Sequence, residues 1–218
     1  GDVDRETQIH GLAAVLGFVS MTGIAGLTLG GGFGYLTRRF GWSSDNVLSM
    51  DVVTADGRVV RASETENSDL FWGLRGGGGN FGIVTSFEYK LHPVGPEVMA
   101  GGIAWSAEHA HDVIEMYRAF TEQAPPELTC VLALRKAPPA PWLAKSVHGQ
   151  PIVAIFVCHS GAIKEGEKQL APVKTFGSPV GDIIQPRSYV SQQSLLDGTQ
   201  PKGRRYYWKS EYLPRLEA

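Results

Sequence analysis

The chain has 218 residues, 43% of them hydrophobic, and a formal net charge of −2. This length suits one large domain or two modest ones, and the apolar fraction is sufficient for a folded core. The near-neutral charge, with acidic and basic residues interspersed, argues against nucleic acid or an anionic membrane as a partner. No apolar run is long enough to predict a membrane span.

The N-terminal part of the chain predicts a helix and then a hairpin. Residues 3–16 carry apolar side chains at helical spacing, so we expect a helix that ends near Gly17. Residues 47–61 contain two β-branched runs on either side of Thr54-Ala-Asp-Gly57. Asp-Gly between such runs is a strong turn signal and predicts a β-hairpin.

A second helix and a strand are expected before a domain boundary. Residues 67–75 predict a short helix that Asn67 or Ser68 caps, and four glycines stop it abruptly. Residues 83–91 alternate in polarity and predict a strand. The segment 92–96 contains two prolines and a glycine, which break the pattern, so we place a boundary there.

Beyond the boundary, strands and helices alternate. Apolar residues at the spacing of one helical face predict a helix over 107–124. A second helix is expected near 162–174, a segment that Gly161 opens and that is rich in Glu and Lys. Strands are expected at 128–135 and 151–159. Hairpin-like connections favour an antiparallel sheet with helices on one side, an α+β domain. The tail, 204–210, is strand-like.

The two cysteines, Cys130 and Cys158, lie in strand-like apolar runs. Two reduced thiols are favoured over a disulfide, because no dense cysteine framework is present. Neither cysteine has the spacing of a metal ligand, and the six histidines are scattered along the chain. The sequence therefore predicts no metal site.

Two glycine-rich segments, 23–34 and 76–85, carry the strongest functional signal. Each glycine costs conformational entropy on folding, but it allows positive φ and lets the backbone approach a ligand closely. Both segments lead into apolar sequence, which predicts a wall of main chain against a flat or phosphorylated cofactor. Tight turns and close packing without a ligand are the alternative, above all for Gly30–Gly32.

The order of four motifs resembles a known family. Gly23–Gly34, Asp45-Asn46, Asp56-Gly57 and Asp69–Thr85, taken together, resemble the flavin-linked oxidases of the berberine bridge enzyme type, within the vanillyl-alcohol oxidase flavoprotein group. The resemblance continues through Tyr207–Ser210. It implies FAD as cofactor, a small-molecule substrate and oxygen as the acceptor.

The resemblance also implies an architecture. Residues 1–94 are expected to form the C-terminal part of a PCMH-type FAD-binding domain. Residues 95–218 are expected to form an antiparallel-sheet substrate domain covered by helices, truncated at its end. The fold class is therefore α+β.

The resemblance assigns cofactor contacts to both glycine segments. The residues expected beside the isoalloxazine ring are Thr22, Gly23, Ile24, Ala25, Gly26 and Thr28. The residues expected beside the ribityl and adenosine portion are Asn80, Gly82, Ile83 and Val84. Backbone N–H groups near the ring would stabilise negative charge on the reduced flavin.

The tail is the expected source of substrate contacts. On a strand, alternate residues face opposite sides, so either Tyr207 with Lys209 or Tyr206 with Trp208 would face the flavin. The alternative, that all four are ordinary strand residues, stays open. No catalytic residue is assigned.

Three positions depart from the family pattern. A cysteine that often attaches the flavin a second time corresponds to Val19, and valine has no thiolate to form that bond. A frequent tyrosine after the triple glycine is Phe33, and a frequent histidine near the flavin pyrimidine is Leu27. These three family groups therefore take no part here.

The ends of the chain leave two functions open. Relatives carry a pyrophosphate-holding segment upstream and often a catalytic base downstream, so the resemblance implies an internal fragment that lacks both. One function is an FAD-dependent oxidase that removes a hydride from an alcohol or amine C–H bond, with a dehydrogenase as its variant. The other is an incomplete fragment that cannot hold FAD and has a structural or self-associating role through exposed sheet edges. Cytoplasm is the default compartment.

Overall fold

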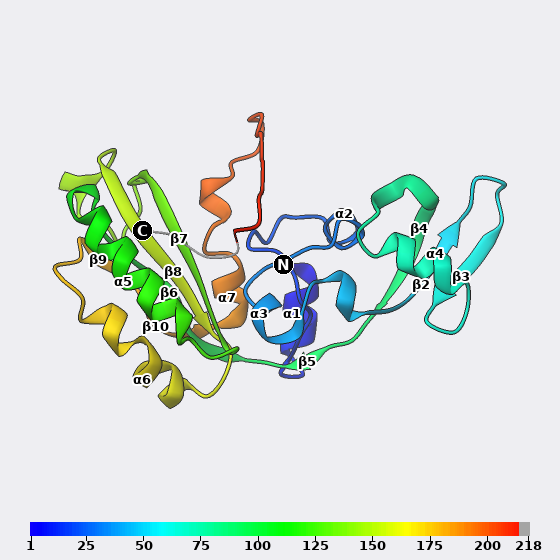
Figure 1. Ribbon diagram of the computed structural model, residues 1–218, viewed down its shortest axis with the longest axis horizontal. Coiled ribbons are helices and arrows are strands. Elements are labelled where there is room, and N and C mark those ends of the chain that lie inside the picture. Colours follow the sequence, from blue (N-terminus) through cyan, green and yellow to red (C-terminus); the bar gives the residue numbers. More distant parts are fainter. Residues whose placement is uncertain (214–218) are drawn as a thin grey trace. The chain divides into compact units, whose positions relative to one another are not determined.

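The computed structural model describes residues 1–213 and divides the chain into two compact units (Figure 1). The first unit contains Gly1–Val98 and Arg187–Leu195, and the second contains Met99–Pro186 and the chain from Leu196 onward. The division falls after Val98, a few residues beyond the expected boundary at 94. The return of 187–195 to the first unit has no signal in the sequence.

The first unit is built from short elements. Its α-helices are α1 (Asp2–Gln8), α2 (Ile24–Leu29), α3 (Thr37–Phe40), α4 (Ser68–Leu74) and α7 (Tyr189–Gln193), and its 3-10 helices are η1 (Ser44–Asn46) and η2 (Gly78–Phe81). Its strands are β1 (Leu12–Ala13), β2 (Val47–Val53), β3 (Val59–Ser63), β4 (Ile83–Tyr89) and β5 (His92–Pro93).

The predicted N-terminal helix is too long. The helix α1 ends at Gln8, Gly11 has a φ of +65°, and β1 follows. The apolar residues that gave the helical spacing are extended instead, and Ala13–Gly17 are buried. Burial of every residue in a short extended run produces apolar spacing that resembles one helical face.

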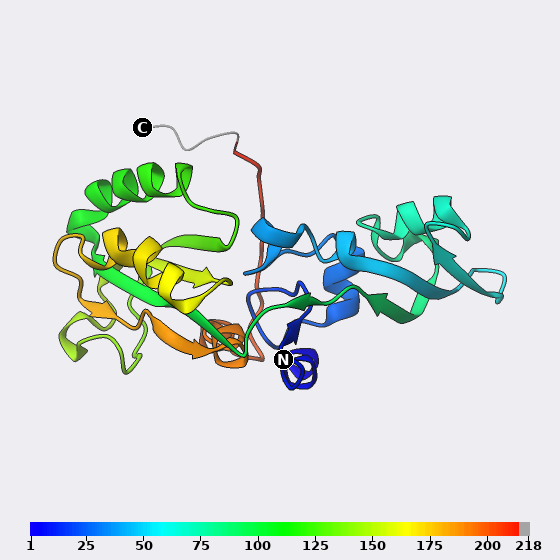
Figure 2. The same cartoon turned by 90° about the horizontal axis from the view of Figure 1, so that it is seen from below.

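The predicted hairpin is confirmed. β2 and β3 pair antiparallel around Gly57, which has a φ of +81°. β4 pairs with the other edge of β2, which gives a three-stranded sheet in the order β3-β2-β4. Figure 2 shows α4 on one side of this sheet, where Phe71 and Leu74 pack against Met50 and Val52.

The second unit centres on one antiparallel sheet. Its strand order is β10-β6-β8-β7, and β9 also pairs with β6. The strands are β6 (Glu97–Ser106), β7 (Leu128–Lys136), β8 (Pro151–His159), β9 (Gly181–Asp182) and β10 (Gln185–Ser188). The helices are α5 (Ala110–Glu122), α6 (Ile163–Lys174) and the 3-10 turns η3 (Ala107–His109), η4 (Lys145–Val147) and η5 (Asp197–Thr199).

Both long helices of the second unit contribute to one core (Figure 1). Val113 of α5 and Leu170 of α6 pack in the same cluster as alternate residues of β6 and β8, among them Ile103 and Ile155. Alternate strand residues face one side of a sheet, so both helices cover the same face. This confirms the expected antiparallel sheet with helices on one side.

The tail does not form the predicted strand. No helix or strand is assigned between Gln200 and Leu213, and Tyr207 and Trp208 are 89% and 73% exposed. A strand needs a neighbouring backbone, and the tail's alternation of residue types does not supply one. Cys130 and Cys158 lie on the adjacent strands β7 and β8 and are not joined in a disulfide. Within residues 1–213 no helix is both long and apolar enough to cross a bilayer.

Candidate functional site

Part of the first glycine segment is glycine because of packing. A Cβ on Gly34 would meet the carbonyl oxygen of Leu16, and one on Gly32 would lie 2.7 Å from the Ser43 hydroxyl oxygen. Gly32 also has a φ of +76°. The expected alternative of close packing therefore accounts for these two positions without a ligand.

Gly23 and Gly26 have no such internal reason. A Cβ on either residue would meet no atom within 4 Å, and neither has a positive φ. Gly26 even lies inside α2, where glycine costs about 1 kcal/mol relative to alanine. Open space beside a backbone that gains nothing from glycine indicates room for a ligand at the main chain.

The second glycine segment divides in the same way. Gly77 is enclosed by Gly73 and Phe81, and Gly82 combines a φ of +142° with a would-be Cβ contact of 2.5 Å to the Val53 carbonyl oxygen. Gly76 and Gly78 have positive φ but open surroundings. Gly79 has neither constraint, so it is the position in this segment that packing and conformation do not explain.

The two segments meet in the fold. The helix α2 contacts η2, so the residues predicted beside the isoalloxazine ring lie next to the segment that carries Asn80. Thr22, Gly23, Ala25 and Gly26 are exposed, and Ile24 is half-buried. These five residues form a continuous accessible stretch of main chain.

Four other predicted residues differ in their placement. Thr28 is fully buried, and its hydroxyl shares a 2.6 Å hydrogen bond with the Tyr89 phenol. Val84 packs against the core of the small sheet, whereas Ile83 is 71% exposed. Asn80 is exposed and donates a hydrogen bond from its side-chain amide to the Gly77 carbonyl oxygen at 2.7 Å. Thr28 and Val84 therefore support the site from within rather than facing solvent.

A cleft of about 330 Å³ lies beside the first segment, and we call it the Asp4 cleft. Its walls include the predicted residues Thr22, Gly23 and Ile24, together with Asp4 from α1 and Gln193 from α7. Asp4 is 0% exposed and Gln193 is 1% exposed. Gln193 donates from its side-chain amide to the Gly17 carbonyl oxygen at 3.4 Å.

Burial raises the pKa of the Asp4 carboxyl above its usual value, because the charged form is removed from water. The nearby Gly1 ammonium, 3.7 Å from one carboxylate oxygen, and the Gln193 side chain lower the pKa and offset part of this effect. The cleft therefore contains an ionisable group that burial biases toward its neutral form.

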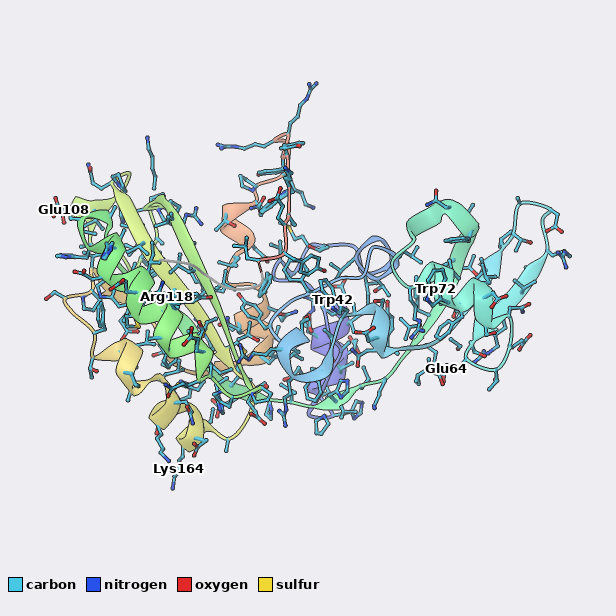
Figure 3. The ribbon with its side chains drawn as sticks, in the orientation of Figure 1. Trp42, Glu64, Trp72, Glu108, Arg118 and Lys164 are labelled. Carbon is cyan, nitrogen blue, oxygen red and sulfur yellow. The ribbon has the colours of Figure 1, made fainter. Side chains whose placement is uncertain are left out.

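A second cleft, of about 580 Å³, lies beside the second segment, and we call it the Trp72 cleft. It is lined by Asp45, Trp72, Gly73, Arg75, Gly76, Gly77 and Phe81. Trp72 is 76% exposed on α4 (Figure 3). The Arg75 guanidinium lies 4.6 Å from the centre of the Phe71 ring, which positions this cation at the cleft.

The predicted substrate residues of the tail are not organised as a site. Tyr207 and Trp208 are exposed, and the Lys209 ammonium forms a 2.7 Å ion pair with Glu211. The expected alternation of faces does not apply, because this part of the chain has no strand geometry. A role for Tyr207, Trp208 and Lys209 stays a prediction.

Sequence reasoning missed Asp4, Gln193, Trp72 and Arg75. Gln193 reaches Gly17 across 176 residues of chain, a separation that no local pattern reveals. Asp4 follows Val3 on a short helix and has the appearance of a solvent-facing carboxylate. Trp72 and Arg75 belong to the motif Asp69–Thr85. Their position beside a cleft depends on the backbone conformation of the glycines that follow Arg75.

Comparisons with known proteins point in one direction. A family model described as "FAD binding domain" matches residues 1–63. An FAD-linked oxidoreductase of Dictyostelium discoideum is 32% identical over 98% of this chain and 44% of its own length. The chain thus spans less than half of that relative.

Solved structures give the same result. The crystal structure of 6-hydroxy-D-nicotine oxidase from Arthrobacter nicotinovorans has a TM-score of 0.79 and 30% identity, covering 93% of this chain and 43% of that one. BBE-like 1 of Physcomitrella patens shares the fold, with a TM-score of 0.74 at 21% identity over 93% of this chain and 42% of its own. The chain is therefore related to the FAD-linked oxidoreductases over nearly its whole length, and it shares the fold of the berberine bridge enzyme-like (BBE-like) proteins.

Proposed function

We propose that the protein binds FAD along Thr22–Gly26 and the adjoining segment around Asn80, and that it oxidises a small molecule. The reaction is the removal of a hydride from a C–H bond next to oxygen or nitrogen, with the electrons passed to oxygen. The observation that carries this proposal is the open space at Gly23, Gly26 and Gly79, where neither packing nor φ calls for glycine.

The residues present fit the flavin. A flat ring needs a main-chain wall without Cβ atoms, and Gly23 and Gly26 supply one on adjacent turns of the chain. The first N–H groups of α2 have no partner within the helix and point out of its N-terminal end. Such groups stabilise negative charge that develops on a nearby ring or oxygen.

The flavin, when bound, supplies the hydride acceptor and returns electrons to the oxidant. The chain's own residues position it. Tyr89 of β4 fixes α2 from the core side through its bond to Thr28, and burial raises the pKa of this phenol. Tyr89 therefore stays protonated at neutral pH, so the contact holds without introducing charge beneath the ring-binding stretch.

The proposed type of reaction is based on the similar proteins. One neighbour is described as an oxidase of 6-hydroxy-D-nicotine, which is a small-molecule substrate of that protein. The same class of reaction on a small molecule is what we propose here. Asn80 and the exposed Ile83 are proposed to contact the ribityl and adenosine side.

The test is a visible absorption spectrum of the purified chain after incubation with FAD and desalting. Retained flavin bands are expected for the wild type. Gly26→Leu keeps a good helix former in α2 but fills the open space, so it should lose the bands. Gly198→Leu is the matched control, because Gly198 is also open and lacks positive φ but lies in the second unit.

A colourless wild-type protein would contradict FAD binding by these residues. It would favour the alternative, a structural or self-associating role, for which the edge strands β3 and β4 offer unpaired backbone. If flavin is retained, peroxide formation in the presence of candidate alcohols and amines tests oxygen as the acceptor. Reduction of the flavin without peroxide would indicate a dehydrogenase.

A further inference from the structure

The guanidinium of Arg75 is a cation without a polar partner in residues 1–213. Its Nε atom is buried and makes no hydrogen bond, and its terminal nitrogens form no ion pair. The neighbouring Phe71 ring attracts the cation but offers no oxygen to its N–H groups. A buried donor without an acceptor is destabilising. The missing partner is therefore an acceptor, and the planar guanidinium matches the paired oxygens of a carboxylate or a phosphate.

A negative charge at the same cleft decides between these two anions. Asp45 lines the Trp72 cleft together with Arg75, and among the described residues no ion pair joins the two. The Asp45 side chain is exposed, and one of its oxygens accepts from the Trp42 N–H at 2.9 Å. A multiply charged phosphate at Arg75 would be repelled by this carboxylate. A ligand with one carboxylate and one ammonium group instead complements both charges.

The rest of the Trp72 cleft suits a flat apolar ring. Trp72 and Phe81 line it and are 76% and 42% exposed, so two aromatic side chains present part of their surface to it (Figure 3). The main chain of Gly76 adds a wall without a Cβ. Aromatic rings prefer to pack against one another edge-to-face or offset-stacked. The volume of about 580 Å³ lies within the range of small-molecule sites.

This cleft is separate from the residues proposed to bind FAD. Neither Thr22–Gly26 nor Asn80 nor Ile83 lines it. Val84 packs in the same cluster as Phe71 of α4, so it faces the helix. Ile83 precedes Val84 on β4 and faces the opposite side of the sheet. A flavin against Ile83 therefore leaves the α4 side, with Trp72, for another ligand.

We propose that the Trp72 cleft binds a free aromatic amino acid. Its carboxylate accepts hydrogen bonds from Arg75, its ammonium group pairs with Asp45, and its ring packs against Trp72. All three residues belong to the first unit. Binding does not rest on the proposed oxidation or on the presence of flavin.

The experiment is isothermal titration calorimetry of the full chain, free of flavin, with L-tryptophan. Tryptamine and indole-3-propionate carry the same ring but lack the carboxylate and the ammonium group, respectively. We expect tryptamine to bind about tenfold or more weakly than tryptophan, because hydrogen bonds between charged groups are the stronger ones. Indole-3-propionate should bind about threefold more weakly, because an exposed ion pair contributes less. Absence of saturable tryptophan binding, or equal binding of either probe, overturns the proposal.

A charge-removing variant locates the site. Arg75→Gln should weaken tryptophan binding about tenfold and remove its advantage over tryptamine. Arg58→Gln is the matched control, because it removes the same charge from the hairpin turn, outside the cleft, where Arg58 pairs with Asp56. It should leave tryptophan binding unchanged. Equal losses in the two variants would indicate a nonspecific charge effect and contradict the site.

Trp72→Ala covers the case in which Arg75→Gln does not fold. Trp72 is mostly exposed, so its removal leaves the core intact, and circular dichroism checks the fold. Tryptophan binding should weaken about fivefold or more through the lost ring contact. Unchanged affinity in the folded variant would overturn the proposal.

A titration of tryptophan with FAD in excess separates this proposal from the flavin site. The affinity should be the same with and without FAD, whether or not the chain retains the flavin. Competition between the two ligands would place tryptophan in the flavin site and overturn the proposal.

Discussion

The two glycine-rich segments look alike in sequence but differ in what holds them. In the first, the glycines that packing requires (Gly32 and Gly34) come after α2, and the open ones (Gly23 and Gly26) come at its start. In the second, the constrained positions Gly77 and Gly82 lie on both sides of the open Gly79. The first segment therefore has one end where packing requires glycine and one accessible end. In the second segment, constrained and open glycines alternate.

This difference distinguishes two reasons why a position is occupied by glycine, which the amino-acid composition alone does not tell apart. A glycine at positive φ or against a backbone oxygen serves folding, and a ligand adds nothing to the explanation. A glycine in open space at negative φ costs conformational entropy on folding, and neither packing nor backbone conformation requires it there. The accessible end of the first segment is accordingly the better indicator of a ligand, and substitutions test the distinction directly.

The largest effect is expected at Gly34. Gly34→Ala places a Cβ against the Leu16 carbonyl oxygen, between two buried stretches that cannot separate without disturbing the core. We expect a loss of about 3 kcal/mol or more in the free energy of unfolding. Urea denaturation measures it, with Gly198→Ala as the neutral comparison. A loss below 1 kcal/mol would show that the packing explanation is wrong.

Gly82→Ala is expected to be the next most costly change. Its φ of +142° is strained for any residue with a Cβ, and the Val53 carbonyl oxygen lies in the way. About 2 kcal/mol is expected, since strained backbone conformations cost of order 1–3 kcal/mol. The same denaturation experiment applies. A neutral result would mean that the second segment adjusts its backbone freely.

Gly26→Ala should have the opposite sign. Alanine is favoured over glycine in a helix interior, so the unfolding free energy should rise by up to about 1 kcal/mol. Retention of FAD should fall at the same time, because the methyl group enters the open space. Stabilisation together with unchanged flavin retention would indicate that this glycine does not face the cofactor.

A smaller, pH-dependent effect is expected at His92, outside both glycine-rich segments. The Asn46 side-chain amide donates to the carbonyl oxygens of Phe40 and Trp42, so its oxygen accepts from Nε2 of His92 at 2.6 Å. Burial, with Lys90 and Arg39 nearby, lowers the pKa of His92 below 6.5. The neutral ring is thus the folded form.

The sign of the pH dependence follows. Above pH 6.5 both folded and unfolded states hold a neutral His92, and its contribution to stability is complete. As the pH falls through the lower folded-state pKa, the unfolded state binds the proton more readily and stability decreases. Denaturation between pH 5 and 8 should show this loss, and His92→Gln should flatten it. An equal slope in both proteins would exclude His92 as its source.

The predictability of the structure depends on how local each signal is. The hairpin predicted over 47–61 is confirmed because the Asp-Gly turn and its β-branched flanks act within a few residues. The helix α5 follows from apolar spacing along one segment, and α6 is expected near 162–174 because that segment opens at Gly161 and is rich in Glu and Lys. Local signals of this kind also located the second unit's sheet.

Other features required information from distant residues. The tail alternates like a strand, but a strand exists only where another backbone pairs with it. The Asp4 cleft is formed in part by Gln193 of α7, which is distant from Asp4 in the sequence. Of the predicted cofactor residues, the stretch from Thr22 to Gly26 is accessible, whereas the side chains of Thr28 and Val84 are turned into the core by partners that the motif does not contain.

The return of 187–195 to the first unit makes the chain cross between the units three times. No single cut separates them: a piece that ends at Val98 lacks the backbone bond from the Tyr189 N–H to the Pro96 carbonyl oxygen and the bond from Gln193 to Gly17. Gene fusion or shuffling of either unit as one continuous stretch would therefore leave the other with a missing piece.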